Sequence, residues 1–236
     1  MYALDGPVAD DHNIGIGVHA LSNLAHADDV IGIGHQAGYS ITTGNRQVLI
    51  GAQAGYDLTD GSENVMIGYQ AGTANTTGQN TAMGHNALAL NQTGTGNTAI
   101  GLKAMDANVD GDNNVAIGEA ALGNMDPSGN VDMYNVAVGY QASVGCTTGV
   151  QNTSVGGDAL FSDDTGSGSV AIGYKSLYAQ NPSGATDMLN VAVGKSAGVA
   201  VTTGVRNVFI GEAAGDLCTT GDSLTIVGRR ARTESA

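Results

Sequence analysis

A short motif recurs along almost the whole chain and constrains its fold more than any other feature. The motif consists of Asn, a β-branched residue, a small residue, Ile or Val, and Gly. Thirteen copies end at what we call the repeat glycines: Gly17, Gly34, Gly51, Gly68, Gly84, Gly101, Gly118, Gly139, Gly156, Gly173, Gly194, Gly211 and Gly228. Most copies are 17 residues apart, and two intervals are 21 residues long. Self-similarity at a fixed period is the signature of a repeat architecture.

The residue types within each copy predict a short strand followed by a turn. The residues one and three positions before the repeat glycine are apolar or β-branched, as at Val65 and Ile67. Side chains two positions apart lie on the same face of a strand, so we expect this pair to face the interior of the coil. Seven positions before the repeat glycine there is usually another glycine, such as Gly44 in Thr-Thr-Gly. This glycine predicts a tight turn with a positive φ angle.

One strand and one turn every 17 residues predict an all-β fold, a parallel β-solenoid or β-roll of about thirteen coils. Stacked parallel strands lie about 4.8 Å apart, so the predicted rod is roughly 60 Å long. The β-roll covers residues 13–228, with an N-terminal cap or extension at 1–12 and a basic C-terminal tail at 229–236. Asn begins nine copies, and we expect its amides to stack into a ladder that satisfies the backbone groups of the turns.

Composition excludes several classes of protein. The chain has no Trp and only ten Phe and Tyr residues, but 42% of it is apolar, which fits a thin, regular core and not a disordered chain. The net charge of −14 argues against nucleic acid and anionic membranes as partners. We also expect no membrane insertion and no signal peptide, because the sequence contains no long apolar run and no charged start.

The residue between the two predicted inward positions indicates an oligomer. On this interpretation it faces away from the coil, yet it is apolar or glycine in every copy except the one with Ser154. A strand that is apolar on both faces is normally buried on both faces. We therefore expect a homo-oligomer, with a trimer as the natural state for a fibre. The alternative is a single wide solenoid covered by other segments, although no amphipathic helix is available to cover it.

The motif also resembles two known groups of proteins. Asn-Val-Ala-Ile-Gly at 114–118 and Asn-Val-Ala-Val-Gly at 190–194 resemble the repeat in the head of trimeric autotransporter adhesins, which is a left-handed parallel β-roll trimer. Together with Thr-Thr-Gly at 76–78 and 147–149, the pattern is more similar to the repeat of fibre-like proteins of tailed bacteriophages. The coil is longer than that of the adhesin heads. The resemblance implies a left-handed homotrimeric β-roll.

This resemblance leads to two functional expectations. The first is a non-enzymatic structural protein of a phage virion, a fibre or a capsid decoration, whose partners are neighbouring virion proteins or a host cell-surface receptor. The alternative is the head of a bacterial adhesin exposed on the cell surface. A third class, a repeat-scaffold hydrolase acting on polysaccharide, would need a carboxylate pair that the sequence does not single out.

The sequence singles out no catalytic residue, no cofactor and no metal site. Residues 106–111 match the first half of a calcium-binding loop, but the twelfth position is Ile117 where such a loop needs Glu. We therefore interpret this segment as a turn. Cys146 and Cys218 occupy equivalent positions four coils apart, which is too far for a disulfide bond.

The two long coils provide the candidate contact loops. The inserts at 123–134 and 179–189 both contain Pro-Ser-Gly followed by Asp-Met, and Asp replaces the turn glycine. Inserted residues must leave the stack while the strands on either side stay in register. We predict that they project and contact a receptor or a virion protein, although a bulge that adjusts the twist between blocks fits as well. The candidate residues are Pro127, Ser128, Asp132, Pro182, Ser183 and Asp187.

Overall fold

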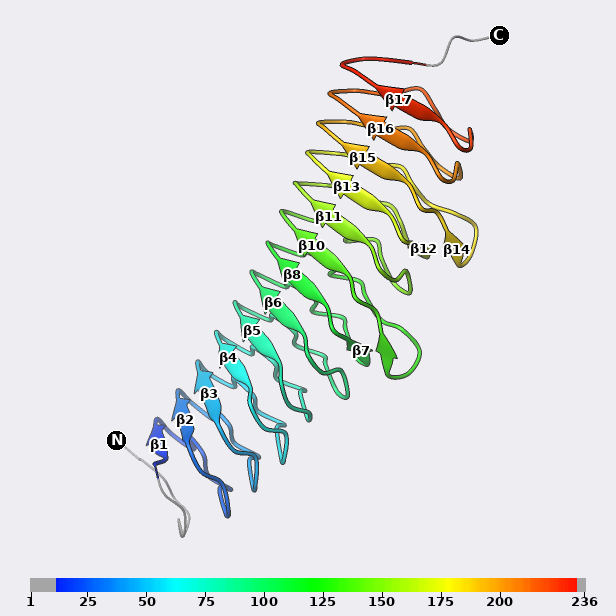
Figure 1. The fold of residues 1–236 in the computed structure, drawn as a ribbon. Coiled ribbons are helices and arrows are strands. Elements are labelled where there is room, and N and C mark those ends of the chain that lie inside the picture. Colours follow the sequence, from blue (N-terminus) through cyan, green and yellow to red (C-terminus); the bar gives the residue numbers. More distant parts are fainter. Residues whose placement is uncertain (1–11, 233–236) are drawn as a thin grey trace. The chain divides into compact units, whose positions relative to one another are not determined.

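The computed structural model describes residues 12–232, and within them every regular element is a β-strand. Figure 1 shows the labelled strands in chain order, one after another. The chain divides into two compact units. Of the described residues, the first unit comprises 12–113 together with 127–131, and the second comprises 114–126 and 132–232. Thirteen parallel strands, one for each predicted coil, confirm the prediction of an all-β parallel β-solenoid with coils of about 17 residues.

The first unit stacks six parallel strands in register. Equivalent positions of successive copies lie side by side, so that Leu49 pairs with Met66 and Met66 with Ala82. A two-residue strand, β7 (Gly111–Asp112), lies in the turn that precedes the next repeat. The six strands are β1 (Ile14–Ile16), β2 (Val30–Ile33), β3 (Gln47–Ile50), β4 (Val65–Ile67), β5 (Thr81–Met83) and β6 (Thr98–Ile100).

The second unit stacks seven strands in the same way. The 21-residue coils do not break the register, because Ala116 still pairs with Ala137, and Ala171 with Ala192. The inserts contain the short strands β9 (Val131–Asp132) and β14 (Thr186–Asp187), and β14 pairs in parallel with β12 (Gly166–Ser167) of the preceding coil. The seven strands are β8 (Val115–Ile117), β10 (Val136–Val138), β11 (Thr153–Val155), β13 (Val170–Ile172), β15 (Val191–Val193), β16 (Val208–Ile210) and β17 (Thr225–Val227).

The faces of the strands are the reverse of those predicted. The middle residue of each strand faces the interior of the coil and is buried, with 0% exposure at Ala82, Met66 and Phe209. The two residues that flank it face outward, and Ile172 on β13 is 40% exposed. The expectation that the flanking pair fills the core was therefore wrong. Both sets are apolar, so polarity did not distinguish one face from the other.

The size of the middle residue follows from packing within the coil. Where the middle residue is large, as at Met66 or Phe209, the residue four positions after the repeat glycine is Gly72 or Gly215, and a Cβ there would collide with the large side chain. Where the middle residue is Ala, this opposing position holds Leu or Met in most copies, such as Leu88. The interior has a constant width, so large and small residues compensate across it. The small middle residues therefore do not indicate the close approach of separate chains.

The turn glycines also have a different role from the predicted one. Gly44 and Gly149, seven positions before a repeat glycine, do not have positive φ angles. A Cβ at either position would instead collide with the carbonyl oxygen of the equivalent glycine in the next coil. Positive φ occurs at the repeat glycine, as at Gly51 with φ 136°, and five positions before it, as at Arg46 with φ 56°. Glycine is needed in these turns because the stacked backbones lie so close together.

The predicted ladder of asparagine amides is confirmed. The side chain of Asn80 is buried, and its Oδ1 accepts a hydrogen bond of 3.0 Å from the backbone N–H of Asn97. Its Nδ2 donates to the carbonyl oxygen of Gly94, 2.9 Å away, in the turn of the next coil. The second unit repeats this geometry at Asn152. Each amide thus satisfies two backbone groups of the following coil, which fixes the register of the stack.

Candidate functional site

One face of the strands is apolar and uncovered in both units. We call it the outer strand face and define it as the residues one and three positions before each repeat glycine. It consists only of Ile, Val, Met and Thr, without a charged residue at any of these described positions. Every one of these side chains keeps partial or full exposure, which reaches 41% at Ile210 and 62% at Val227. Parallel sheets are normally covered on both faces, so an apolar strand face that stays exposed is unusual.

The candidate contact loops are partly exposed. Ser183 and Asp187 are exposed in the second loop, and Gly184 at its tip has open space around its Cα. Pro182, in contrast, is buried, and so is Met188. The structure therefore places the proline and the methionine against the stack, and presents the serine, glycine and aspartate to solvent.

The first loop follows the same pattern. Ser128 and Asp132 are exposed, Pro127 is buried, and Gly129 has open space around its Cα. Pro127 and Ser128 belong to the first unit and Asp132 to the second. Ser128 and Asp132 are thus accessible to solvent, whereas the projection of the loops and their role as contacts stay predictions.

In two runs of three successive coils, the residue seven positions after the repeat glycine is a buried polar residue or cysteine, and we call these residues the second ladder: Asn75, Asn91 and Asn108, then Cys146, Asp163 and Gln180. It contains Asp163, whose side chain is buried with 2% exposure. Burial raises the pKa of this carboxyl to about 6, although hydrogen bonds from Gln180 and the Gly166 N–H oppose the shift. Burial and the nearby Asp163 also raise the pKa of the Cys146 thiol to about 12.

The segment that resembles half of a calcium-binding loop forms a turn. Asn108 is buried in the second ladder, where its Oδ1 accepts the Gly111 N–H at 3.0 Å. Asp110 accepts a hydrogen bond of 2.6 Å from the Thr93 hydroxyl of the preceding coil. Among the residues that the structure describes, no three His, Cys, Asp or Glu side chains come together as metal ligands.

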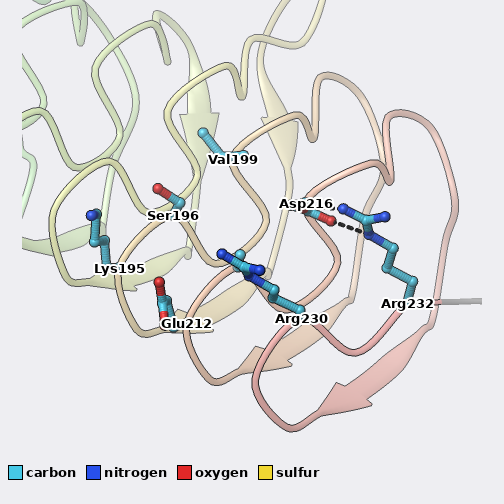
Figure 2. A pocket seen from close by; sticks show the side chains of 8 residues that line it. Lys195, Ser196, Val199, Glu212, Asp216, Arg230 and Arg232 are labelled. Carbon is cyan, nitrogen blue, oxygen red and sulfur yellow. Dashed lines mark hydrogen bonds and ion pairs between the residues drawn. The ribbon is translucent and has the colours of Figure 1, made fainter.

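A pocket that sequence reasoning missed lies in the second unit, on the turns that follow β15, β16 and β17 (Figure 2). We call it the basic pocket. Its volume is about 470 Å³. The predicted tail contributes to it, because residues 229–232 continue the last coil with a hydrogen bond from the Arg230 N–H to the Glu212 carbonyl oxygen. The lining residues are Lys195, Ser196, Val199, Glu212, Ala213, Asp216, Arg230 and Arg232.

Two ion pairs fix the carboxylates of the basic pocket. Arg229 Nε donates to Glu212 Oε2 at 2.8 Å, and Arg232 binds both oxygens of Asp216 at 2.7 and 2.8 Å. These partners lower the pKa of both carboxyls below their ordinary values. Lys195 and Arg230 make no side-chain hydrogen bond or ion pair within residues 12–232. Two cations therefore remain available next to two anchored carboxylates.

The remaining predicted residues do not form a further site. Both cysteines are free thiols; Cys146 is buried and Cys218 is partly exposed.

Across the described part of the chain, no helix has the length and apolarity needed to cross a membrane. If the copies are aligned on their repeat glycines, Asp163 falls at a position that holds Asn in other coils. The same alignment places the small residues Ser196 and Ala213 of the basic pocket where other coils have Gln. Both features could have been found in this way.

Comparison with known proteins identifies no relative. No family model matches the chain, and no curated protein or solved structure matches it.

Proposed function

We propose that this chain is a non-enzymatic structural protein that assembles with copies of itself through the outer strand face. The observation that carries this proposal is the exposure of the Ile, Val, Met and Thr side chains on the outer strand face. A soluble monomer rarely exposes a contiguous apolar patch of more than a few hundred Å². Burial of apolar surface is the dominant favourable term in protein association, so this face has a strong tendency to find a partner.

A second copy of the same chain is the partner that fits best. The face carries Ile, Val, Met or Thr at the same two positions of every coil, so two copies present surfaces of matching period. If each outer side chain on the thirteen strands loses on the order of 40 Å², each copy buries about 1,000 Å², which exceeds the roughly 800 Å² per partner of a standard interface. Three copies arranged around an axis would cover the outer strand face of each one.

The biological setting follows from the resemblance of the motif to phage fibre repeats. We propose a fibre or a decoration of a tailed-phage virion, with the loops at 123–134 and 179–189 as contacts to a host receptor or to a neighbouring virion protein. The exposure of Ser128, Asp132, Ser183 and Asp187 supports this role for the loops. The head of a bacterial adhesin remains the second candidate, because the same motif resembles that group and the same face would assemble it.

Localisation separates the two candidates. Antibodies raised against the folded chain should label purified phage particles from the source in immuno-electron microscopy and should detect the intact chain in their denatured proteins. Labelling of bacterial envelopes, with none on particles, would contradict the virion proposal and support the adhesin. An oligomer of the purified chain is expected in both cases, so that measurement tests assembly alone.

A further inference from the structure

The basic pocket exists because a row of long side chains is interrupted. Two positions after the repeat glycine, the first unit carries Gln36, Gln53 and Gln70, whose amides form hydrogen bonds of 3.2 and 2.9 Å from coil to coil. The equivalent positions in the second unit include Ser196 and Ala213, which are short. These two residues line the hollow where the first unit has an amide row.

The charges around this hollow are unusual for the chain. The protein has only eight Lys and Arg residues and a net charge of −14, yet three of the eight cations line this pocket. Figure 2 shows Lys195 and Arg230 on either side of Glu212, and Arg232 held by Asp216. The cations of the lining outnumber the carboxylates, so the pocket can hold an anion that the rest of the surface repels.

The two kinds of charge select a ligand that carries both an anionic group and hydroxyl groups. A guanidinium binds a carboxylate in a bidentate fashion, and within residues 12–232 no side-chain hydrogen bond occupies the donors of Arg230 and Lys195. An anchored carboxylate accepts several hydrogen bonds, and Arg229 is bonded to Oε2 of Glu212 only. Hydroxyl groups would donate to these remaining acceptor sites. A simple phosphate offers no comparable set of hydroxyl donors to the carboxylates.

We propose that the basic pocket binds a sugar acid, with the ligand carboxylate on Lys195 and Arg230 and its hydroxyl groups on Glu212 and Asp216. A volume of about 470 Å³ lies within the usual range for small-molecule sites. The pocket lies on the turns and not on the outer strand face, so binding does not depend on self-assembly.

Titration by ligand-observed NMR tests this proposal, with D-glucuronate, D-glucose and inorganic phosphate as separate probes. Glucuronate should bind in a saturable manner. Glucose, which lacks the carboxylate, and phosphate, which lacks the set of hydroxyl donors, should each bind roughly tenfold more weakly. Arg230→Gln should weaken glucuronate by a similar factor. Lys103→Gln is the matched control, because Lys103 occupies the equivalent position in the first unit, away from this pocket, and its substitution should leave binding unchanged.

A second variant separates the pocket from simple surface charge. Ala213→Gln places at this position the residue that the chain itself uses at Gln53, with a similar positive φ, and it fills the pocket without changing a charge. Its thermal melting should match that of the wild type, while glucuronate binding should be lost. The proposal is overturned if Ala213→Gln or Arg230→Gln binds glucuronate like the wild type. Equal binding of all three probes, or no saturable binding of glucuronate, would also overturn it.

Discussion

The second ladder differs between the two units. In the first unit it consists of Asn75, Asn91 and Asn108; Asn91 donates to Asn75 at 2.6 Å, and Asn108 donates to Asn91 at 2.8 Å. In the second unit the corresponding consecutive positions hold Cys146, Asp163 and Gln180. Gln180 Nε2 donates to Asp163 Oδ2, so the direction of the bond is the same although one partner is a carboxylate.

The difference shows what a buried stack requires of its polar residues. An amide both donates and accepts, so a row of identical amides satisfies itself without charge. A carboxylate only accepts, and it remains in the row because Gln180 and the Gly166 N–H both donate to it. The satisfied hydrogen bonds do not remove the cost of burying a charge, which appears as the raised pKa of Asp163.

The largest loss of stability is expected when Gln180, which donates to Asp163, is replaced by an acid. Gln180→Glu places a carboxylate against Asp163 in a buried position and removes the donor between them, so two like charges face each other at one site. We expect a loss of about 3–5 kcal/mol in the free energy of unfolding at pH 8, measured by denaturant titration. The loss should shrink at pH 4, where protons neutralise the pair. An equal loss at both pH values would contradict the electrostatic explanation.

The charge of Asp163 itself is expected to have a smaller effect, a dependence of the free energy of unfolding on pH. Its folded-state pKa of about 6 lies above the ordinary value of 3.8, so the folded state holds the proton more tightly than the unfolded state does. Its contribution to stability is therefore greatest below pH 4, falls as pH rises to 6, and is constant above pH 6. Over this range the change amounts to about 3 kcal/mol at most.

Asp163→Asn supplies the matched comparison for this pH dependence. The variant reproduces the amide of Asn91 or Asn108 at the same position, so this part of the pH dependence should disappear and stability at pH 8 should rise. Asp164→Asn is the control, because the neighbouring carboxyl is only partly buried. Thermal melts at pH 4, 6 and 8 provide the measurement. A pH profile of Asp163→Asn that matches the wild type would show that another group titrates.

The smallest expected effect concerns the chemical reactivity of the Cys146 thiol in the second ladder. Burial raises the pKa of Cys146 to about 12, so almost no reactive thiolate forms at pH 8. We expect a thiol reagent such as iodoacetamide to modify Cys146 only after unfolding, and Cys218, which is partly exposed, to react first. Mass spectrometry of the labelled peptides measures both rates. Rapid modification of Cys146 in the native protein would contradict its buried position.

The sequence predicts the period, the number of coils and the amide ladder, because each depends on one residue type recurring at one spacing. It did not reveal which face of the strand is inside. The middle residue and its neighbours are both apolar, so the usual alternation of polar and apolar residues is missing. The sizes of the side chains show which face is inside, because a large middle residue is matched by a small residue four positions after the repeat glycine, and a small one by a large one. Met66 is matched by Gly72, and Ala82 by Leu88.

The basic pocket depends on side chains from three successive coils, so no local motif marks it. Lys195, Glu212 and Arg229 occupy the same position in successive copies. Only the stacking of the coils brings them together. Spacing within one copy therefore predicts the fold well, whereas the binding surfaces follow from the comparison of one copy with the next.

The correction of the strand faces changes which substitution tests assembly. Ala116 and Ala137 face the interior, so charges there would unfold the coil and reveal nothing about an interface. Ile172 and Ile210 are on the outer strand face and are 40% and 41% exposed, so glutamate at both positions is compatible with the folded monomer. Leu217 is 67% exposed in the turn that follows Ile210, which makes Leu217→Glu a suitable control for the added charge.

Sedimentation velocity on the wild type, on Ile172→Glu with Ile210→Glu, and on Leu217→Glu tests assembly through the outer strand face most directly. We predict that the wild type and Leu217→Glu sediment as one oligomer, with three times the mass of the chain. The double variant should sediment as a monomer whose circular dichroism still shows β-structure. A wild type that sediments as a folded monomer, or a double variant that keeps the oligomeric mass, would contradict the account.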